Sequence, residues 1–438
     1  MQDGKKTPDP FLAVGGTDTL IDRDALASHL DALIDRLITQ PGAKRLLIIP
    51  PDITRLNSRA GEITAYLWDK LHDTVHIDIL PALGTHKPMT PVQCAKLFGP
   101  AVPFDRILPH DWRNDLTELG EVSAARMGEL SAGRFAQPMQ VAINKRLVEG
   151  GYDRILSIGQ VVPHEVIGMA NYTKNIMIGV GGKDTINKSH FLGAVCGMES
   201  IMGQADSPVR RALNTAYDTF VRDRLPITFI LSVIGDSADG LVMRGLYAGD
   251  GDDTFEQAAA LSKRINFDVL DEPISRCVVY LDPDEFHSTW LGNKAIYRTR
   301  MAMADGGELI ILAPAVDTFG EDPEIDRLIR KHGYHGTPAT LGALDQDPDL
   351  AGNLSAAAHL IHGSTEGRFN VTYCTTAALP REQVEGVGYR HRDYADAARQ
   401  YAPDRLGTSP GWHTDADGQA FFYIPNPALG LWASQSRL

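Results

Sequence analysis

The chain has little cysteine, no excess of positive charge and no long hydrophobic segment, and each absence excludes a class of protein. Only four of its 438 residues are cysteine, and none stands in a Cys-x-x-Cys pair, which argues against a disulfide framework or a thiolate zinc site. Its 42 lysines and arginines against 56 aspartates and glutamates give a net charge of −14, which argues against binding to nucleic acid or anionic membranes.

The apolar segments are too short for a membrane span. No stretch approaches the ~20 apolar residues that a transmembrane helix needs, and the polar residues 1–10 do not resemble a signal peptide. With 43% apolar content, the chain is long enough for two or three domains that each bury a core. We therefore expect a cytoplasmic enzyme, whose charge still allows a small anionic substrate held by arginine side chains.

Helix and strand patterns alternate through the first half of the chain. Apolar residues recur with helical spacing in residues 24–38 and again in residues 58–72. Four short apolar runs predict strands, at residues 45–50, 75–80, 104–108 and 154–158. This alternation predicts an α/β fold with mainly parallel sheets.

The second half repeats the pattern less regularly. Further strands are expected at residues 227–233, 241–247, 277–281 and 309–312, with a helix at 254–265. We predict that residues 1–270 form an N-terminal α/β domain carrying the catalytic groups, and that residues 271–438 form a C-terminal α/β domain that closes the substrate site. The active site is expected in the cleft between the two domains. The strand-like segment 420–424 fits either domain, so the extreme C-terminus is a candidate to return to the first one.

Polar side chains gather where the predicted strands of the first half end. In open α/β sheets, ligands bind beyond the carboxyl ends of parallel strands. The candidates by this criterion are Asp52, Arg55, His86, His110 and His164. Most of the fourteen histidines are expected to be hydrogen-bonded surface groups, and His110 beside an aspartate is expected to belong to a capped turn.

Two cations among these loops suit a site for an organic acid and a cofactor. Arg55 carries a guanidinium that matches a carboxylate, although an internal ion pair with Asp52 fits the sequence equally well. Lys174 lies between Tyr172 and the apolar residues 176–178, where an amine is a candidate for a covalent bond to a cofactor rather than a solvated group.

Four motifs in order resemble those of the lactate racemase family, whose members use a nickel-pincer nucleotide. They are Asp-Ile-Thr-Arg at residues 52–55, Gly-Thr-His-Lys at 84–87, the segment from His164 to Lys174, and Thr-Ile-Asn-Lys-Ser-His at 185–190. The resemblance is specific over residues 45–200 and looser beyond. It implies a two-domain α/β isomerase, a racemase or epimerase, that inverts the C2 stereocentre of a 2-hydroxy acid by reversible hydride transfer.

The resemblance also implies catalytic roles. His86 and His164 would be the proton-transfer pair, Lys174 would attach the nickel-pincer nucleotide covalently, and His190 would be the nickel ligand. Hydride removal avoids the dianion that direct deprotonation would form, and an imidazole with a pKa near neutrality suits the hydroxyl proton. Inversion is then expected to need two bases, one for each enantiomer.

The remaining roles concern binding. Asp52, Thr54 and Tyr297 would bind the cofactor, and Arg55 and Arg298 would bind the substrate. Imidazole is a sound nickel ligand when the pincer supplies sulfur and carbon donors. Because other proteins must build such a nucleotide, enzymes of cofactor biosynthesis are implied as partners.

The chain departs from the lactate-specific members at two places. Before the lysine they carry Gly-Gly-Arg, where this chain has Asn-Tyr-Thr at residues 171–173, and of the Pro-Gly after the lysine only Gly179 is kept. In the family's Tyr-Gln-x-x-Lys segment, Arg298 replaces the glutamine and Met301 replaces the lysine. We therefore expect a substrate larger than lactate, such as a sugar acid.

Two other functions fit the same residues. A zinc hydrolase or lyase would use His86, His164 and His190 as metal ligands around an activated water. A non-catalytic carrier of nickel or of the cofactor would not need the paired bases.

Overall fold

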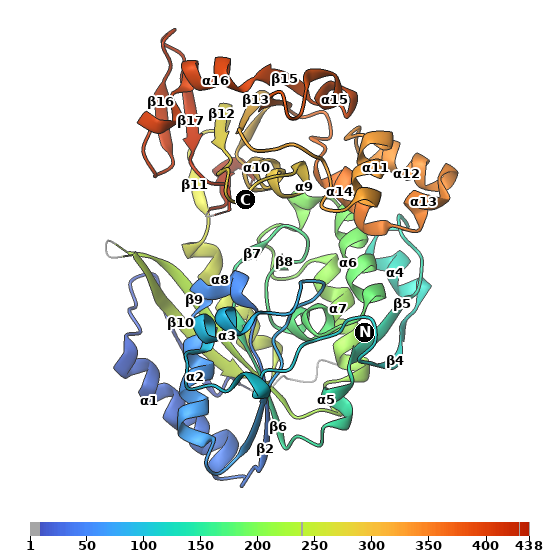
Figure 1. The fold of residues 1–438 in the computed structure, drawn as a ribbon. Coiled ribbons are helices and arrows are strands. Elements are labelled where there is room, and N and C mark those ends of the chain that lie inside the picture. The colour runs from blue at the N-terminus through green and yellow to red at the C-terminus, as the bar shows by residue number, and fades with distance from the viewer. Residues whose placement is uncertain (1–8, 238–239, 429, 438) are drawn as a thin grey trace. The chain divides into compact units, whose positions relative to one another are not determined.

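The computed structural model describes residues 9–237, 240–428 and 430–437, which form two compact units (Figure 1). Unit 1 is built from the described residues up to Leu192 and from Ile201–Asn266. Unit 2 is built from Gly193–Ser200 and from the described residues after Phe267. No helix in these ranges is long and apolar enough to cross a membrane.

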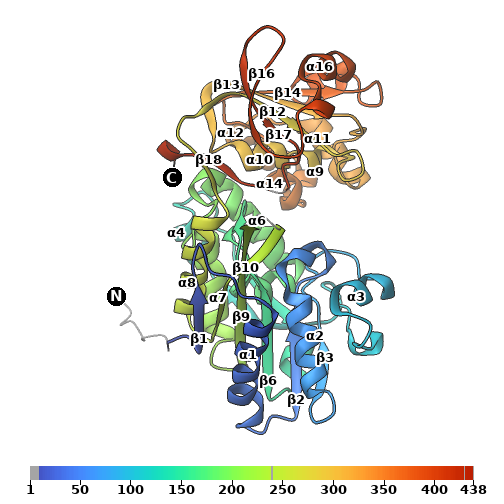
Figure 2. The same ribbon diagram turned by 90° about the vertical axis from the view of Figure 1, so that its left-hand side faces the viewer.

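A six-stranded sheet forms the centre of unit 1, in the order β1-β10-β9-β6-β2-β3 (Figure 2). The strands β9, β6, β2 and β3 run parallel to their neighbours, and β10 and β1 extend the sheet antiparallel. Their bounds are β1 (Leu12–Gly15), β2 (Arg45–Ile49), β3 (His76–Ile79), β6 (Arg154–Gln160), β9 (Ile227–Ser237) and β10 (Gly240–Gly249).

Helices cover this sheet because its strands are apolar on both faces. Alternate residues of β2, Leu46 and Ile48, join one core with Leu30 and Leu33 of α1 and with Ile63 of α2. The helical elements of unit 1 are α1 (Arg23–Ile34), η1 (Asp35–Thr39), η2 (Ile53–Ser58), α2 (Ala60–Leu71), α3 (Pro91–Phe98), η3 (Phe104–Arg106), α4 (Ala124–Leu130), α5 (Lys145–Glu149), η4 (Asn175–Gly179), α7 (Pro208–Phe220) and α8 (Asp252–Ile265). Two small antiparallel pairs complete it, β4 (Leu116–Val122) with β5 (Met139–Asn144) and β7 (Pro163–His164) with β8 (Gly168–Met169).

Helix α6 (Lys183–Cys196) begins in unit 1 and ends in unit 2, followed by η5 (Met198–Ser200). A second six-stranded sheet organises unit 2, in the order β15-β14-β13-β12-β17-β16, and only the pair of β16 with β17 is antiparallel. Its strands are β12 (Ile274–Tyr280), β13 (Met303–Ala313), β14 (Asn370–Thr375), β15 (Arg390–Asp393), β16 (Gly411–Thr414) and β17 (Ala420–Ile424). A parallel pair joins β11 (Asp268–Leu270) to β18 (Trp432–Ser434).

The helices of unit 2 lie mainly between β12 and β15 in the chain. They are α9 (Thr289–Gly292), α10 (Lys294–Thr299), α11 (Pro323–His332), α12 (Thr337–Gln346), α13 (Pro348–Ala351), α14 (Leu354–His362) and α15 (Arg381–Gly386), followed after β15 by α16 (Tyr394–Tyr401), η6 (Pro403–Arg405) and η7 (Gln435–Arg437).

The α/β class with mainly parallel sheets is confirmed. Segment 420–424, which fitted either domain in the sequence, forms β17 and pairs with β12 inside unit 2.

The strand predicted at residues 104–108 is wrong. Phe104–Arg106 forms a short 3₁₀ helix, and only Ile107 makes a bridge, to Ile79 of β3. Pro103 and Pro109 flank the segment, and because proline donates no backbone hydrogen bond they leave too few residues for a ladder.

Candidate active site

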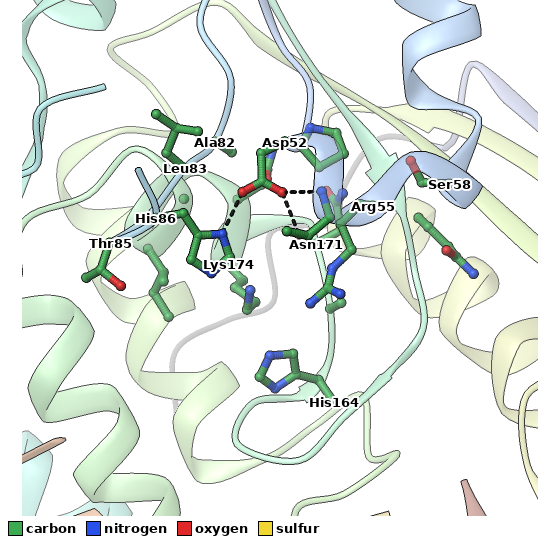
Figure 3. Close-up of a pocket in the computed structure, with 18 of the residues that line it drawn as sticks. Asp52, Arg55, Ser58, Ala82, Leu83, Thr85, His86, His164, Asn171 and Lys174 are labelled. Carbon is green, nitrogen blue, oxygen red and sulfur yellow. Dashed lines mark hydrogen bonds and ion pairs between the residues drawn. The ribbon is translucent and has the colours of Figure 1, made fainter. Parts of the chain in front are cut away.

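A pocket in unit 1 lies beyond the carboxyl ends of β2, β3 and β6 (Figure 3). All of its lining residues belong to unit 1. It brings together seven residues that the sequence singled out: Asp52, Thr54, Arg55, His86, His164, Lys174 and His190.

Asp52 holds His86 in a fixed orientation. Asp52 follows β2, is 4% exposed and caps η2 by accepting hydrogen bonds at Oδ1 from the backbone N–H of Thr54 (3.0 Å) and from its hydroxyl (2.5 Å). Its other oxygen, Oδ2, accepts from Nδ1 of His86 at 2.5 Å. Burial by itself would raise the pKa of Asp52, but the hydrogen bonds from His86 and Thr54 outweigh it, so the pKa is lowered and the group is a carboxylate.

Arg55 remains available for a ligand. The carboxylate of Asp52 is occupied by His86 and Thr54, so the internal pair of Arg55 with Asp52 is not formed. The side chain of Arg55 lines the pocket, and Figure 3 shows it pointing from the wall of Asp52 toward His164. A guanidinium in this place suits the carboxylate of an organic acid.

His164 is held by the backbone of its own turn. It ends β7, and its Nδ1 accepts from the backbone N–H groups of Val166 at 3.1 Å and Ile167 at 3.4 Å. Burial, with the charges of Lys174 and Arg55, lowers the pKa of His164 well below its ordinary value of 6.5, so the ring is neutral.

Lys174 lies on the same pocket as a buried amine. Burial and, next, the charges of Arg55 and Arg210 lower the pKa of Lys174 to about 8, which leaves roughly a tenth of the amine neutral at pH 7. A neutral amine is the nucleophilic form, and such a pKa suits covalent attachment of a cofactor.

The turn before Lys174 takes the left-handed conformation without glycine. Asn171 has φ 65° and Tyr172 has φ 59°, at the two places where the lactate-specific pattern has glycines. A positive φ is strained in a residue with a side chain, and the contacts of Tyr172 stabilise the turn against this strain. The Tyr172 ring is fully buried and stacks on Phe255, and its hydroxyl donates to Asp252 Oδ1 at 2.5 Å. Residues 171–172 therefore differ in sequence from the lactate-specific pattern but still adopt the positive φ angles that glycine favours.

Arg210 of α7 fastens the same turn and was not foreseen from the sequence. Its guanidinium is buried and donates to the carbonyls of Met169 (2.5 Å) and Asn171 (3.1 Å) and to the hydroxyl of Thr173 (2.8 Å). Thr173 stands where the lactate-specific pattern has arginine, so a guanidinium reaches this place from another helix. No local signal marks Arg210, because it is an ordinary polar residue of a helix in the sequence.

His190 of α6 presents one nitrogen to the pocket. Its Nδ1 donates to the carbonyl of Ile186 at 2.6 Å, which leaves the Nε2 lone pair for a ligand, as in metal-binding histidines. Burial lowers the pKa of His190, which also favours the neutral form that binds metals.

Glycines bring the loops of the pocket together. The backbone N–H of Gly84, two residues before His86, donates to the carbonyl of Gly179 at 2.8 Å, which ties the His86 loop to the helical turn after Lys174. A Cβ on Gly179 would lie 2.7 Å from the Cβ of Ala82, so only glycine permits this approach.

Two candidate residues belong to unit 2. The hydroxyl of Tyr297 in α10 bonds Nδ1 of the buried His359 at 2.9 Å, and Arg298 is the next residue of the same helix. Their roles in binding cofactor and substrate stay predictions. His110 has the structural role expected of it, because its ring bonds the carbonyl of Gly181 and the side chain of Asn144, both at 3.0 Å.

The donor set fits a metal held mainly by a cofactor. Among the residues that the structure describes, no group of three or more His, Cys, Asp or Glu side chains is placed to hold a metal ion. The Nδ1 atoms of His86, His164 and His190 are all engaged, so each ring offers at most one nitrogen to a ligand. One imidazole beside a nucleophilic amine matches a metal brought in by an organic ligand that the amine anchors.

Comparison with known proteins bears on the family resemblance and on the fold. Residues 24–203 match the lactate racemase N-terminal domain. A solved structure of a Thermotoga maritima protein is similar, with a TM-score of 0.78 at 23% identity, covering 96% of this chain and 100% of that chain. The lactate racemase apoprotein from Thermoanaerobacterium thermosaccharolyticum is also similar, with a TM-score of 0.64 at 18% identity over 93% of this chain and 92% of that chain. No curated protein matches this chain.

Proposed function

We propose that this chain is an isomerase of the racemase type, since its residues 24–203 match the lactate racemase N-terminal domain. In finer terms, we propose that it inverts C2 of a 2-hydroxy acid with a nickel-pincer nucleotide. The observation that carries the proposal is the pocket that holds a carboxylate-supported imidazole, His86, a buried amine, Lys174, and an imidazole with a free nitrogen, His190.

Lys174 and His190 are the residues that would hold the cofactor. The amine of Lys174 would anchor it covalently, and Nε2 of His190 would ligate nickel. When bound, the nickel-pincer nucleotide supplies a hydride acceptor beside the substrate carbon. Asp52 and Thr54 line the same pocket and would contact the cofactor from the end of β2.

The rest of the chemistry is left to the protein. Arg55 would bind the carboxylate of the substrate and fix the orientation of the carbinol carbon. His86 would take the hydroxyl proton as the carbon is oxidised and return it when the keto acid is reduced, and its bond to Asp52 would stabilise the cation that it becomes. His164 lies across the pocket from Asp52 (Figure 3) and would face the same substrate.

A substrate larger than lactate is supported by the replacements in unit 2. Arg298 and Met301 stand where the family pattern has glutamine and lysine, so the polar groups that this segment would offer to a substrate differ in kind and position. We propose a hydroxy acid with further hydroxyl groups, such as a sugar acid. A purified enzyme that inverts lactate faster than any longer hydroxy acid would contradict this assignment.

The test is to produce the chain together with nickel and the enzymes that build the cofactor, and to follow 2-deuterated hydroxy acids by NMR. Hydride transfer predicts inversion with the deuterium retained at C2, whereas wholesale exchange with solvent would indicate proton abstraction. Mass spectrometry of the peptide that contains Lys174 is expected to show the added cofactor. The variant Lys174→Arg, which keeps the charge, is expected to show neither the added mass nor activity.

The same preparation separates the competing functions. Stoichiometric zinc without added mass at Lys174 would support a hydrolase or lyase, for which the described residues offer no three-ligand site. A carrier would load the cofactor but would turn over no hydroxy acid, and His86→Gln would change nothing in it.

A further inference from the structure

Two amide side chains of the unit 1 pocket have no part in the proposed chemistry. Gln160 is the last residue of β6, Asn171 lies in the turn before Lys174, and both line the pocket that contains Arg55. Figure 3 shows Asn171 and Arg55 in this pocket. An amide has two N–H donors and an acceptor oxygen, and a buried or partly buried one needs partners for them.

Asn171 offers a hydrogen-bond donor to the pocket. Its Oδ1 lies 2.7 Å from the backbone nitrogen of Tyr172, and since a backbone N–H can only donate, this contact fixes which end of the amide is oxygen. Its Nδ2 lies against the end of β6, because a Cβ on Gly159 would be only 1.9 Å from it. Among the described residues none accepts a hydrogen bond from this NH₂ group, and the group is not enclosed by protein.

Gln160 offers both a donor and an acceptor. Its side-chain amide forms no hydrogen bond within the described parts of the chain, and neither of its polar atoms is enclosed by protein. Gly159, which touches Nδ2 of Asn171, is the residue just before it. Both amides therefore lie at the carboxyl end of β6, where the pocket opens.

Asn175 shows the contrasting case of a structural amide in the same pocket. Its Nδ2 donates to the carbonyl of Ile49 at 3.2 Å and to the hydroxyl of Ser157 at 2.9 Å, so it fastens η4 to β2 and β6. The NH₂ group of Asn171 and the amide of Gln160 have no such task in the described structure. Their place in the pocket is thus accounted for by a ligand.

The pocket favours hydroxyl groups as that ligand. Its arginine and its lysine are Arg55 and Lys174, which the proposed function assigns to the substrate carboxylate and to the cofactor. A second carboxylate would meet neutral amides here in place of a cation, and an apolar chain would leave the donors without acceptors, which weakens binding. A hydroxyl group both donates and accepts, so it can pair with either amide.

We propose that Gln160 and Asn171 determine specificity by binding the hydroxyl groups on C3 and C4 of a polyhydroxy acid whose carboxylate is held by Arg55. The inference rests on the proposed function and narrows its substrate class to acids that carry hydroxyl groups beyond C2. The two amides take no part in proton or hydride transfer. They stabilise the transition state of the hydroxylated substrates alone, which is how a site discriminates between acids of equal length.

Four-carbon acids test this with every stereochemistry present. Threonate and erythronate, each as both enantiomers, cover all configurations at C2 and C3, and 2-hydroxybutanoate is the same chain without the C3 and C4 hydroxyls. For the nickel-loaded enzyme we expect kcat/KM of the best trihydroxy acid to exceed that of 2-hydroxybutanoate by about tenfold or more, as two ordinary hydrogen bonds would give. Faster inversion of 2-hydroxybutanoate or of malate than of every trihydroxy acid would overturn the proposal.

Two variants remove one amide each. Asn171→Gly keeps the backbone, since glycine adopts its positive φ without strain, and Gln160→Met keeps the length of the side chain. Each is expected to lower kcat/KM for the best trihydroxy acid about three- to tenfold and to leave that for 2-hydroxybutanoate within about twofold. Gln140→Met, at an exposed position of β5 outside the pocket, is the control and is expected to change neither. Equal losses for both acids, or less cofactor on the Lys174 peptide, would assign the amides to the cofactor and overturn the proposal.

Binding to the full chain without cofactor separates this inference from the proposed function. In isothermal titrations we expect threonate or erythronate to bind more tightly than 2-hydroxybutanoate, and Asn171→Gly and Gln160→Met to reduce the difference. If the loaded wild type inverts no hydroxy acid but this difference is seen, the proposed function fails and the recognition of hydroxyl groups stands. Equal affinity for the two kinds of acid would overturn the inference.

Discussion

Replacing Asp52 by asparagine is expected to move the ring proton of His86 from Nδ1 to Nε2. One oxygen of the side chain must still accept from the backbone N–H of Thr54, so the amide oxygen takes the Oδ1 place and the NH₂ group takes the Oδ2 place. The NH₂ group then faces Nδ1 of His86 as a donor. Nδ1 becomes the acceptor, the proton moves to Nε2, and the base becomes a hydrogen-bond donor.

The size of the loss follows from the bond that is removed. A hydrogen bond to a charged group contributes about 1.5–3 kcal/mol net. At about 1.4 kcal/mol for each factor of ten, its loss from the step that charges His86 lowers kcat by about 10- to 150-fold, and the wrong tautomer adds to this. Folding is expected to be nearly unchanged, because asparagine also caps a helix well.

The assay is kcat for inversion of the best hydroxy acid, together with the ¹⁵N-histidine spectrum of Asp52→Asn. Asp78→Asn is the matched control, since Asp78 is also a largely buried aspartate in a strand of the same sheet, bonded to His76 at 3.0 Å and Tyr152 at 2.8 Å, but it does not line the pocket. A kcat for Asp52→Asn within about threefold of the wild type, or an unchanged proton on His86, would refute the reasoning.

Three further predictions concern stability and the lysine turn. Gly159→Ala places a Cβ 1.9 Å from the side-chain nitrogen of Asn171, so it is expected to displace the turn and reduce cofactor attachment. The measurement is the fraction of the Lys174 peptide that carries the added mass, and full loading would contradict the prediction. Tyr172→Phe removes the hydroxyl bond to Asp252 and is expected to lower the free energy of unfolding by about 1–3 kcal/mol in urea titrations, with no change if that bond is unimportant. Hydrogen bonds overcome burial and lower the pKa of Asp78, so its stabilisation is present above pH ~3.8 and is lost as the pH falls through its folded pKa. The destabilisation by Asp78→Asn is therefore expected to shrink between pH 7 and pH 3 in thermal unfolding, and a constant difference would contradict the assigned charge.

The strands of unit 1, and the sheet edge at which the site lies, could be predicted from the sequence because each depends on neighbouring residues. Apolar runs of strand length predicted β2, β3 and β6, and polar residues just after them had to meet at one edge of a parallel sheet. The segment 104–108 shares the apolar signal, but its flanking prolines prevented a ladder.

The remaining features depend on contacts between distant parts of the chain. Arg210 lies 37 positions after Thr173, and nothing near it in the sequence indicates that its guanidinium reaches the turn. The proton positions on His86 and His164 depend on partners that only the folded chain supplies. Sequence spacing alone made the two imidazoles look equivalent.

The left-handed turn before Lys174 has a consequence for thermal stability. Because Tyr172 and Arg210 make this turn part of the protein interior, a bound group at Lys174 restrains the same residues that pack on α7 and α8. A group that makes its contacts only in the folded form stabilises that form. Attachment of the cofactor to Lys174 is thus expected to raise the temperature at which the packing around Tyr172 is lost. The apoprotein is expected to be cleaved faster by proteases.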